Sequence, residues 1–362
     1  MNAHRRLPFV AIIASLPFAA VPAYAGFYDG KNVTVIVNAG AGGGLTRICQ
    51  TFSSFMEKHL GKNTNMVIKN VPGSGGIKGL NLYAEKTKAD GLTILWGAKN
   101  LTAVLLKKPG VRYDPAQFKM IGWHADTYVS IARTDIGTGL KTPADLVKVK
   151  GIIVGGRAPS SALDLYSNLP LRILGITDYR YVPGYNAQPK MNAAIRSKEI
   201  NMLTTGHPGY HAFYKNTILK SGEAVALYYH APIDYRTGKP IDVGGRYPSN
   251  IKNFLDYYRE VKGKDPTGPL WELYKWFSTF EGGPMGYITL KDTPADRLAE
   301  LRRAYGETTK DPGFLAAMKK QLRDLPVHFF VGEEGQFVLD DYKNISPEAL
   351  KGLKELTAKP KS

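Results

Sequence analysis

The chain has 362 residues, of which 43% are hydrophobic and 22% charged, and its formal net charge is +17. This composition is that of an ordinary globular protein and excludes wholesale disorder. The length exceeds the ~250–300 residues that a single hydrophobic core usually serves, so we expect two domains.

Residues 1–25 have the pattern of a secretory signal peptide. Arg5 and Arg6 precede an apolar run from Leu7 to Ala20, and Ala23-Tyr24-Ala25 then supplies the small residues of a cleavage site. The apolar run is shorter than the ~20 residues that a membrane-spanning helix needs. We therefore expect cleavage after residue 25, a mature chain of net charge about +15, and a soluble exported protein.

The next elements predict a parallel sheet. A β-branched strand over 32–37 is followed by a glycine loop and a helix over 46–60, then by a strand over 65–70, a short helix to about residue 88 and a strand over 92–97. Strands that alternate with helices are typical of a parallel sheet covered by helices.

A second series begins after Lys119–Arg133, a segment long enough to run from one sheet into another. It contains a strand over 151–156, a helix over 161–174, strands over 179–184 and 199–206, and a helix around 189–197. Two such units joined by crossing strands enclose a cleft, and small ligands bind in clefts of this kind.

The composition of residues 234–283 shifts toward polar and aromatic side chains. The segments 250–261 and 270–277 each have the pattern of an amphipathic helix, which predicts a helical hairpin packed on a domain surface. A face for docking a partner and a lid over the cleft are the alternatives. Two further helices are expected between Thr293 and Leu322, separated by Asp311-Pro312-Gly313.

Two loops have the composition of anion-binding sites. In Asn38–Thr46, glycines allow backbone N–H groups to converge at the start of a helix, where the helix dipole favours negative charge. Gly155–Ser161 repeats this arrangement and adds Arg157, which attracts anions. The alternative for the first loop is a tight turn, and for the second a helix cap formed by serine.

Other classes of function find little support in the sequence. Basic residues are spread along the chain, so we expect no nucleic-acid partner. His207 and His211 have the spacing of a metal pair, but Pro208-Gly209 between them interrupts the helix that would align them. Because no set of nucleophile and base is visible either, we expect no metal, no cofactor and no catalytic residues, and so a protein that is not an enzyme.

Several motifs in this order resemble those of the periplasmic solute receptors of tripartite tricarboxylate transporters, the Bug receptors. They are AGAGGGLT, KNVPGSGGIKG, KADGLTILWG, GGRAPSSALDL, VPGYNAQP and EINMLTTG. The resemblance implies an α/β fold of two lobes, the type II-like periplasmic-binding-protein fold, with a ligand cleft between them. The expected lobes are 26–125 with 230–362, including the insertion 234–283, and 126–229.

The resemblance also implies which residues hold the ligand. They are Ala41, Gly42, Gly43, Gly44, Leu45, Thr46, Asn100, Thr102, Ser160, Ser161, Asp164 and Thr205. Family members commonly have Asp at the positions of Thr46 and Thr205, and His at the position of Asp164. Because two carboxylates are missing, we expect a ligand that is an acid without a cationic group.

The sequence thus predicts a monomeric receptor that captures a small organic anion, a mono- or dicarboxylate, and delivers it to membrane permease subunits. Two alternatives remain open. One is a sensory or scaffold protein of the same fold that docks a membrane partner through 234–283, and the other is an exported enzyme.

Overall fold

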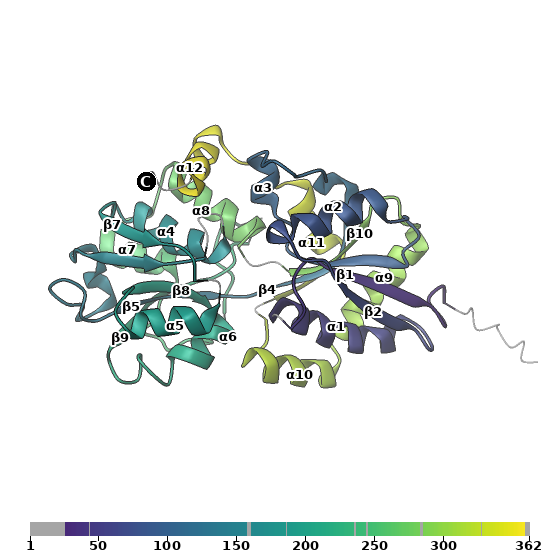
Figure 1. The fold of residues 1–362 in the computed structure, drawn as a ribbon, viewed down its shortest axis with the longest axis horizontal. Coiled ribbons are helices and arrows are strands. Elements are labelled where there is room, and N and C mark those ends of the chain that lie inside the picture. The colour runs from purple at the N-terminus through teal and green to yellow at the C-terminus, as the bar shows by residue number, and fades with distance from the viewer. Residues whose placement is uncertain are drawn as a thin grey trace, which may run out of the picture.

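A computed structural model describes residues 26–42, 44–157, 161–185, 187–234, 237–243, 245–282, 285–326 and 328–358. The chain forms two lobes, each built on its own β-sheet, and strand β4 leads from one lobe toward the other (Figure 1). This confirms the expected two-lobed α/β fold. The predicted signal peptide lies outside the described residues.

The sheet of the first lobe has six strands in the order β11-β4-β10-β3-β1-β2. β1 is parallel to β2 and β3, whereas β10 is antiparallel to β3 and β4, and β11 is antiparallel to β4. The bounds are β1 Asn32–Val37, β2 Asn65–Asn70, β3 Thr93–Gly97, β4 Phe118–Ala125, β10 Met285–Leu290 and β11 His328–Val331.

Helices cover both faces of this sheet because its strands carry apolar side chains on both. One cluster joins α1, α9 and α10 to the face that includes Val35 and Trp96, with the fully buried Phe52 stacked on Tyr305 at 5.4 Å between ring centroids. The other face packs against α2, α3 and α11. The bounds are α1 Gly44–Leu60, α2 Ile77–Lys86, α3 Leu101–Leu105, α9 Ala295–Thr308, α10 Pro312–Leu322 and α11 Glu333–Asp340.

The sheet of the second lobe has five strands in the order β7-β6-β8-β5-β9. β6 is parallel to β7 and β8, and β5 is antiparallel to β8 and β9. The bounds are β5 Tyr128–Arg133, β6 Ile152–Gly155, β7 Tyr179–Val182, β8 Met202–Gly206 and β9 Ala224–His230, with helices α4 Ala162–Ile173, α5 Gln188–Arg196 and α6 His207–Gly209.

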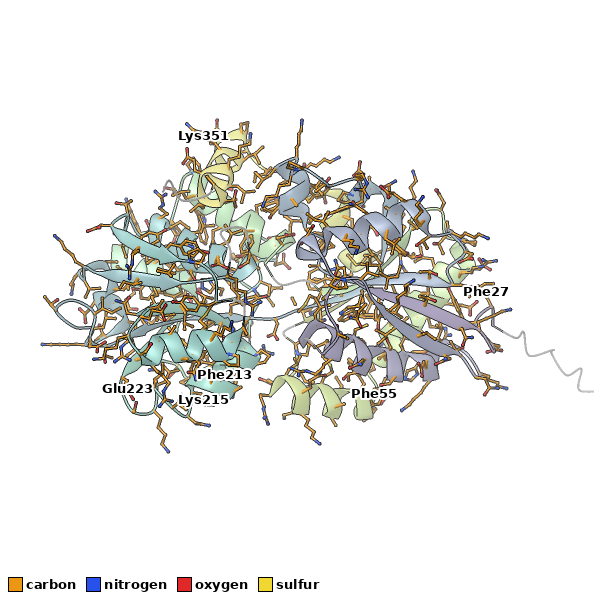
Figure 2. The ribbon with its side chains drawn as sticks, in the orientation of Figure 1. Phe27, Phe55, Phe213, Lys215, Glu223 and Lys351 are labelled. Atoms are coloured by element: carbon orange, nitrogen blue, oxygen red, sulfur yellow. The ribbon has the colours of Figure 1, made fainter. Side chains whose placement is uncertain are left out.

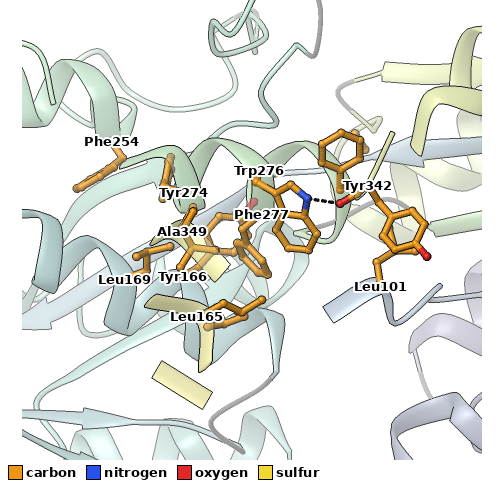
Figure 3. Packing of buried hydrophobic residues seen from close by; sticks show 14 of the residues in the cluster. Leu101, Leu165, Tyr166, Leu169, Phe254, Tyr274, Trp276, Phe277, Tyr342 and Ala349 are labelled. Atoms are coloured by element: carbon orange, nitrogen blue, oxygen red, sulfur yellow. Dashed lines mark hydrogen bonds between the residues drawn. The ribbon is translucent and has the colours of Figure 1, made fainter. Parts of the chain in front are cut away.

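The helices of the insertion pack on the second lobe, although we expected 234–283 to belong to the first. α7 (Phe254–Lys262) contacts β9, and α8 (Pro269–Phe280) contacts α4. The C-terminal helix α12 (Pro347–Thr357) returns from α11 to cover α8, and the buried Trp276 Nε1 donates to Tyr342 O at 2.7 Å (Figure 3). The exact lobe boundaries stay a prediction.

α8 is also more deeply buried than a surface hairpin would be. Eight of its residues are buried, which an amphipathic helix exposed on one side does not achieve; they are Trp271, Leu273, Tyr274, Trp276, Phe277, Ser278, Thr279 and Phe280. The helix lies between α4 and α12, so it belongs to the hydrophobic core. Among the described residues, no helix combines the length and apolar character needed to cross a bilayer.

Candidate ligand-binding site

The topology places the predicted binding loops on two edges that face each other. β4 runs parallel to β1–β3, because β10 is antiparallel to both β3 and β4, and it ends at Ala125 where the chain leaves for the second lobe. In the second lobe, β5 begins at Tyr128 and is antiparallel to β8. The carboxyl ends of β1–β3 and of β6–β8 therefore point toward the junction of the lobes, where ligands of open α/β sheets bind.

In the first lobe, three loops converge on the buried side chain of Asn38. Its Nδ2 donates to Ala98 O at 2.7 Å, which ties the loop after β1 to the loop after β3. Gly76 and Gly97 lie so close that a Cβ atom on either would overlap the Asn38 amide. Asn38 thus fixes the relative positions of the loops that follow β1, β2 and β3.

Two more polar side chains hold the glycine loop in place. Thr46 is buried and its hydroxyl donates to Gly40 O at 2.8 Å, while Asn70 Nδ2 donates to Ala39 O and to Thr46 Oγ1, each at 2.9 Å. Thr46 is therefore a positioning residue. Gly42 has φ 76°, a conformation that favours glycine.

The described residues Gly40, Ala41, Gly42 and Gly44 of this loop are exposed, and Leu45 is half-buried. Gly43 lies outside the described residues. The first turn of α1 contains no acidic residue, so no carboxylate of that turn opposes the positive end of the helix dipole.

The segment that contains Asn100 and Thr102 is held by the loop after β2 and by Glu281 at the end of α8. Asn100 Nδ2 donates to Gly75 O at 2.8 Å, and Leu101 N–H donates to Glu281 Oε2 at 3.0 Å. Thr102 is buried, so it supports the loop from behind. Burial lowers the pKa of the neighbouring Lys99 ammonium and raises that of the Glu281 carboxyl, and the attraction between these two groups opposes both shifts.

In the second lobe, Asp164 has the role that Asn38 has in the first. Its fully buried carboxylate accepts hydrogen bonds from Tyr181 OH at 2.6 Å, from Arg157 N–H at 3.1 Å and from the Ser161 hydroxyl. Burial and the Asp164 charge raise the pKa of the Tyr181 phenol. Ser161 also caps α4 by accepting from Asp164 N–H at 3.3 Å.

Thr205 is fully buried in β8, and its hydroxyl donates to Gly206 O at 3.4 Å. A Cβ atom on Gly209 would overlap that hydroxyl, so Thr205 supports the turn after β8 from inside. Ser160 lies outside the described residues.

Arg157 brings a positive charge to the same edge. Its Nε is buried and makes no hydrogen bond, and no carboxylate forms an ion pair with it among the residues that the structure describes. The side chain lies near Tyr128: burial raises the pKa of that phenol to about 12, and the Arg157 charge opposes part of the rise. The edge of the second lobe therefore carries a guanidinium whose Nε has no hydrogen-bond partner among the described residues.

The histidine pair His207 and His211 belongs to a polar cluster. His207 Nδ1 lies 3.1 Å from Tyr247 OH, and the two imidazole rings contact each other edge to face. Within the described ranges, no group of three or more His, Cys, Asp or Glu side chains could hold a metal ion.

Sequence reasoning missed Asn38, Asn70, Tyr181 and Glu281. An amide at the end of a β-strand, as the last residue (Asn70) or directly after it (Asn38), was a usable signal for the first two. Tyr181 and Glu281 reach the loops from elements far along the chain, so nothing local pointed to them.

Several solved structures are similar to this chain. A TctC solute-binding protein from Polaromonas is 17% identical, with 91% of this chain and 99% of that chain covered and a TM-score of 0.64. The chain has the fold of the periplasmic solute-binding proteins. An adipate-bound protein of R. palustris is 17% identical over 90% of this chain and 97% of its own, with a TM-score of 0.60.

The periplasmic binding protein BugD is 20% identical, with coverage of 91% and 98% and a TM-score of 0.57. No protein-family model and no curated protein matches the sequence. The TctC protein and BugD are binding proteins, and the three structures bear out the expected fold.

Proposed function

We propose that this protein is a periplasmic receptor of the tripartite tricarboxylate type, which captures a small organic carboxylate and delivers it to a membrane permease. The observation that carries the proposal is Arg157. Its guanidinium has no acidic partner among the described residues, and it lies on the edge that faces the start of α1, where the first turn is free of acidic residues. A carboxylate bound between the lobes would interact with both the guanidinium and the start of α1.

The energetics are compatible with this assignment. Two or three charge-assisted hydrogen bonds contribute about 1.5–3 kcal/mol each. A micromolar complex requires a net of about 8 kcal/mol, so burial of the carbon body of the ligand has to supply part of the affinity. A hinge motion that closes the lobes would provide that burial.

The ligand is an acid without an ammonium group. The Asp164 carboxylate accepts from three donors of its own lobe, so it has little capacity left for a ligand amine. Thr46 and Thr205 are both buried and bonded to backbone carbonyls. The adipate-bound neighbour supports a dicarboxylate in particular.

The test is calorimetric titration of the mature protein with acetate, succinate, adipate and aspartate. We expect a dicarboxylate to bind best and aspartate to bind poorly. Arg157→Gln should weaken binding of the best ligand about thirtyfold, because at least one charge-assisted contact is lost.

Arg172→Gln is the matched control, because Arg172 is an exposed arginine in the last turn of α4. It should leave the affinity unchanged. Absence of heat and of a thermal shift with every acid would contradict the proposal, as would turnover of any of them.

Docking of a membrane partner through 234–283 has less support. The aromatic residues of α8, which suggested a docking face, are buried between α4 and α12. The insertion is needed to complete the core of the second lobe.

A further inference from the structure

A cavity of about 220 Å³ lies between the lobes, away from the predicted binding loops. One wall comes from the first lobe, through Trp123 of β4, Phe330 of β11 and Phe337 of α11. The other wall comes from Ile233 and Ile241, which follow β9, and from Ser278, Thr279 and Gly282 at the end of α8. We call it the hinge cavity.

The hinge cavity is separate from the candidate carboxylate site. It lies at the β11–β4 side of the first sheet, whereas the binding loops follow β1, β2 and β3 on the other side of β10. None of the residues predicted to bind the carboxylate is among the described residues that line it.

The first-lobe wall is an aromatic surface. Trp123 and Phe330 stack with ring centroids 3.9 Å apart and an interplanar angle of 12°, and Phe337 meets Phe330 edge to face. Trp123 Nε1 already donates to Gly335 O at 3.2 Å, so the indole presents an apolar ring to the cavity. Flat apolar walls of this kind accept ring-shaped or branched hydrocarbon groups.

The polar groups of the cavity favour a cation. Asp234 and Glu334 contribute carboxylates, and Glu334 Oε1 lies 2.9 Å from His328 Nε2. No lysine or arginine occurs among the lining residues described, although the chain has 48 Lys and Arg against 31 Asp and Glu. Ser278 Oγ is buried and makes no hydrogen bond in the described part of the chain. A bound ammonium group would gain from the carboxylates, whereas the Trp123 ring already has Lys99 Nζ 5.7 Å from its centroid.

We propose that the hinge cavity binds a small organic ammonium ion with an aromatic or branched apolar body, and that its occupancy shifts the balance between open and closed lobes. An apolar cavity of about 150 Å³ is sufficient for benzene, so 220 Å³ accommodates a ring with a short amine. Because both lobes form the walls, lobe rotation changes the cavity. A ligand that fits one arrangement better stabilises that arrangement.

The binding test uses benzylamine, with benzyl alcohol and benzoate as probes of the same ring that differ in charge. Trp123 in the wall provides a fluorescence signal. We expect benzylamine to bind the mature protein with a dissociation constant of about 1 mM or lower, and benzoate at least tenfold more weakly. Glu334→Gln should weaken the binding of benzylamine at least threefold without changing the affinity for benzyl alcohol.

Ser278→Met tests the location, because it fills the cavity and replaces the unpartnered hydroxyl. The variant should unfold at a higher temperature than the wild type and lose benzylamine binding. Ser249→Met, at an exposed serine, should do neither. No binding of benzylamine up to 10 mM, or equal binding by Ser278→Met, would overturn the site, and equal affinity for benzyl alcohol would overturn the preference for a cation.

The hinge is tested with fluorophores on cysteines that replace Lys58 in α1 and Lys215 in the second lobe. Both lysines are exposed, and Phe55 of α1 and Lys215 lie on different lobes (Figure 2). Benzylamine should change energy transfer between them, and Ser278→Met should abolish the change. Binding without such a change would overturn the effect on the hinge. Neither readout needs a carboxylate, so this inference can fail or stand independently of the proposed function.

Discussion

The loops of the two lobes are held by side chains of nearly the same shape and different charge. In the first lobe the loops meet around the Asn38 amide, and in the second lobe they meet around the Asp164 carboxylate. In each lobe a glycine leaves room for that side chain: a Cβ atom on Gly97 would overlap Asn38, and one on Gly156 would overlap Asp164.

Among the described residues, only the second lobe has a buried charge at the centre of its loops. The Asp164 carboxylate is balanced by three donors, one of which is the backbone N–H of Arg157. The first lobe uses a neutral amide, so it adds no negative charge beside the start of α1. The proposed anionic ligand would therefore meet Arg157 on one lobe and the positive end of the α1 dipole on the other.

Replacing Asp164 should have the largest effect. Asp164→Ala leaves Tyr181 OH and Arg157 N–H buried without their acceptor, and hydrogen bonds to charged groups are worth about 1.5–3 kcal/mol each. We expect the free energy of unfolding, measured in urea, to fall by about 4 kcal/mol. Asp178→Ala, at an exposed position after α4, should change it by less than ~0.5 kcal/mol. A loss of less than about 1 kcal/mol for Asp164→Ala would mean that the loop does not depend on it.

Replacing Asn38 should have a smaller effect, because the group that is lost is neutral. Asn38→Ala removes the hydrogen bond to Ala98 O and leaves a gap against Gly76 and Gly97. We expect a loss of about 3 kcal/mol, of which about 1 kcal/mol comes from the hydrogen bond. Asn65→Ala, which removes an exposed amide pair with Asn32, is the control and should be nearly neutral. Equal losses for Asn38→Ala and Asp164→Ala would remove the distinction between the lobes.

Local patterns were sufficient to predict the strands and helices that carry the loops. The β-branched run over 32–37 and the glycine loop after it correspond to β1 and the start of α1, and the two-unit alternation is present. The burial of α8 was not predictable, because its aromatic residues have the same helical spacing whether one side or all sides are covered. Likewise, the position of α12 depends on tertiary contacts with α8 that its own sequence does not encode.

The binding loops were likewise predictable only in part. Its glycines and Arg157 were visible in the sequence, but the function of Thr46 depends on Asn70, which is 24 residues away. In a sequence, a threonine whose hydroxyl faces a ligand looks the same as a threonine whose hydroxyl holds a loop together. Only the hydrogen-bond partner of the hydroxyl distinguishes them.

The buried histidines of the two lobes make stability depend on pH, and this effect should be smaller than those of replacing Asp164 or Asn38. His124 of the first lobe is packed against Phe52 and Trp96, and burial, assisted by the positive charge of Lys99, lowers its pKa to about 3. Burial also lowers the pKa of His207 and His230 in the second lobe to about 3. Between pH 6.5 and 3 the unfolded chain therefore binds protons that the folded chain does not, so stability falls as the pH falls through this window.

For one such histidine the difference between pH 8 and pH 5 is about 2 kcal/mol. His124→Phe keeps an aromatic ring in the stack and removes a buried Nδ1 that has no hydrogen-bond partner. Between pH 8 and pH 5, the free energy of unfolding measured in urea should therefore fall by about 2 kcal/mol less for the variant than for the wild type. Above pH 7.5 the two stability curves should run parallel, because His124 is then neutral in both states. If the two stability curves stay parallel down to pH 4, His124 becomes protonated in the folded protein as readily as in the unfolded chain. The loss of stability in acid would then have to arise in the second lobe, where His230 has partners on both ring nitrogens.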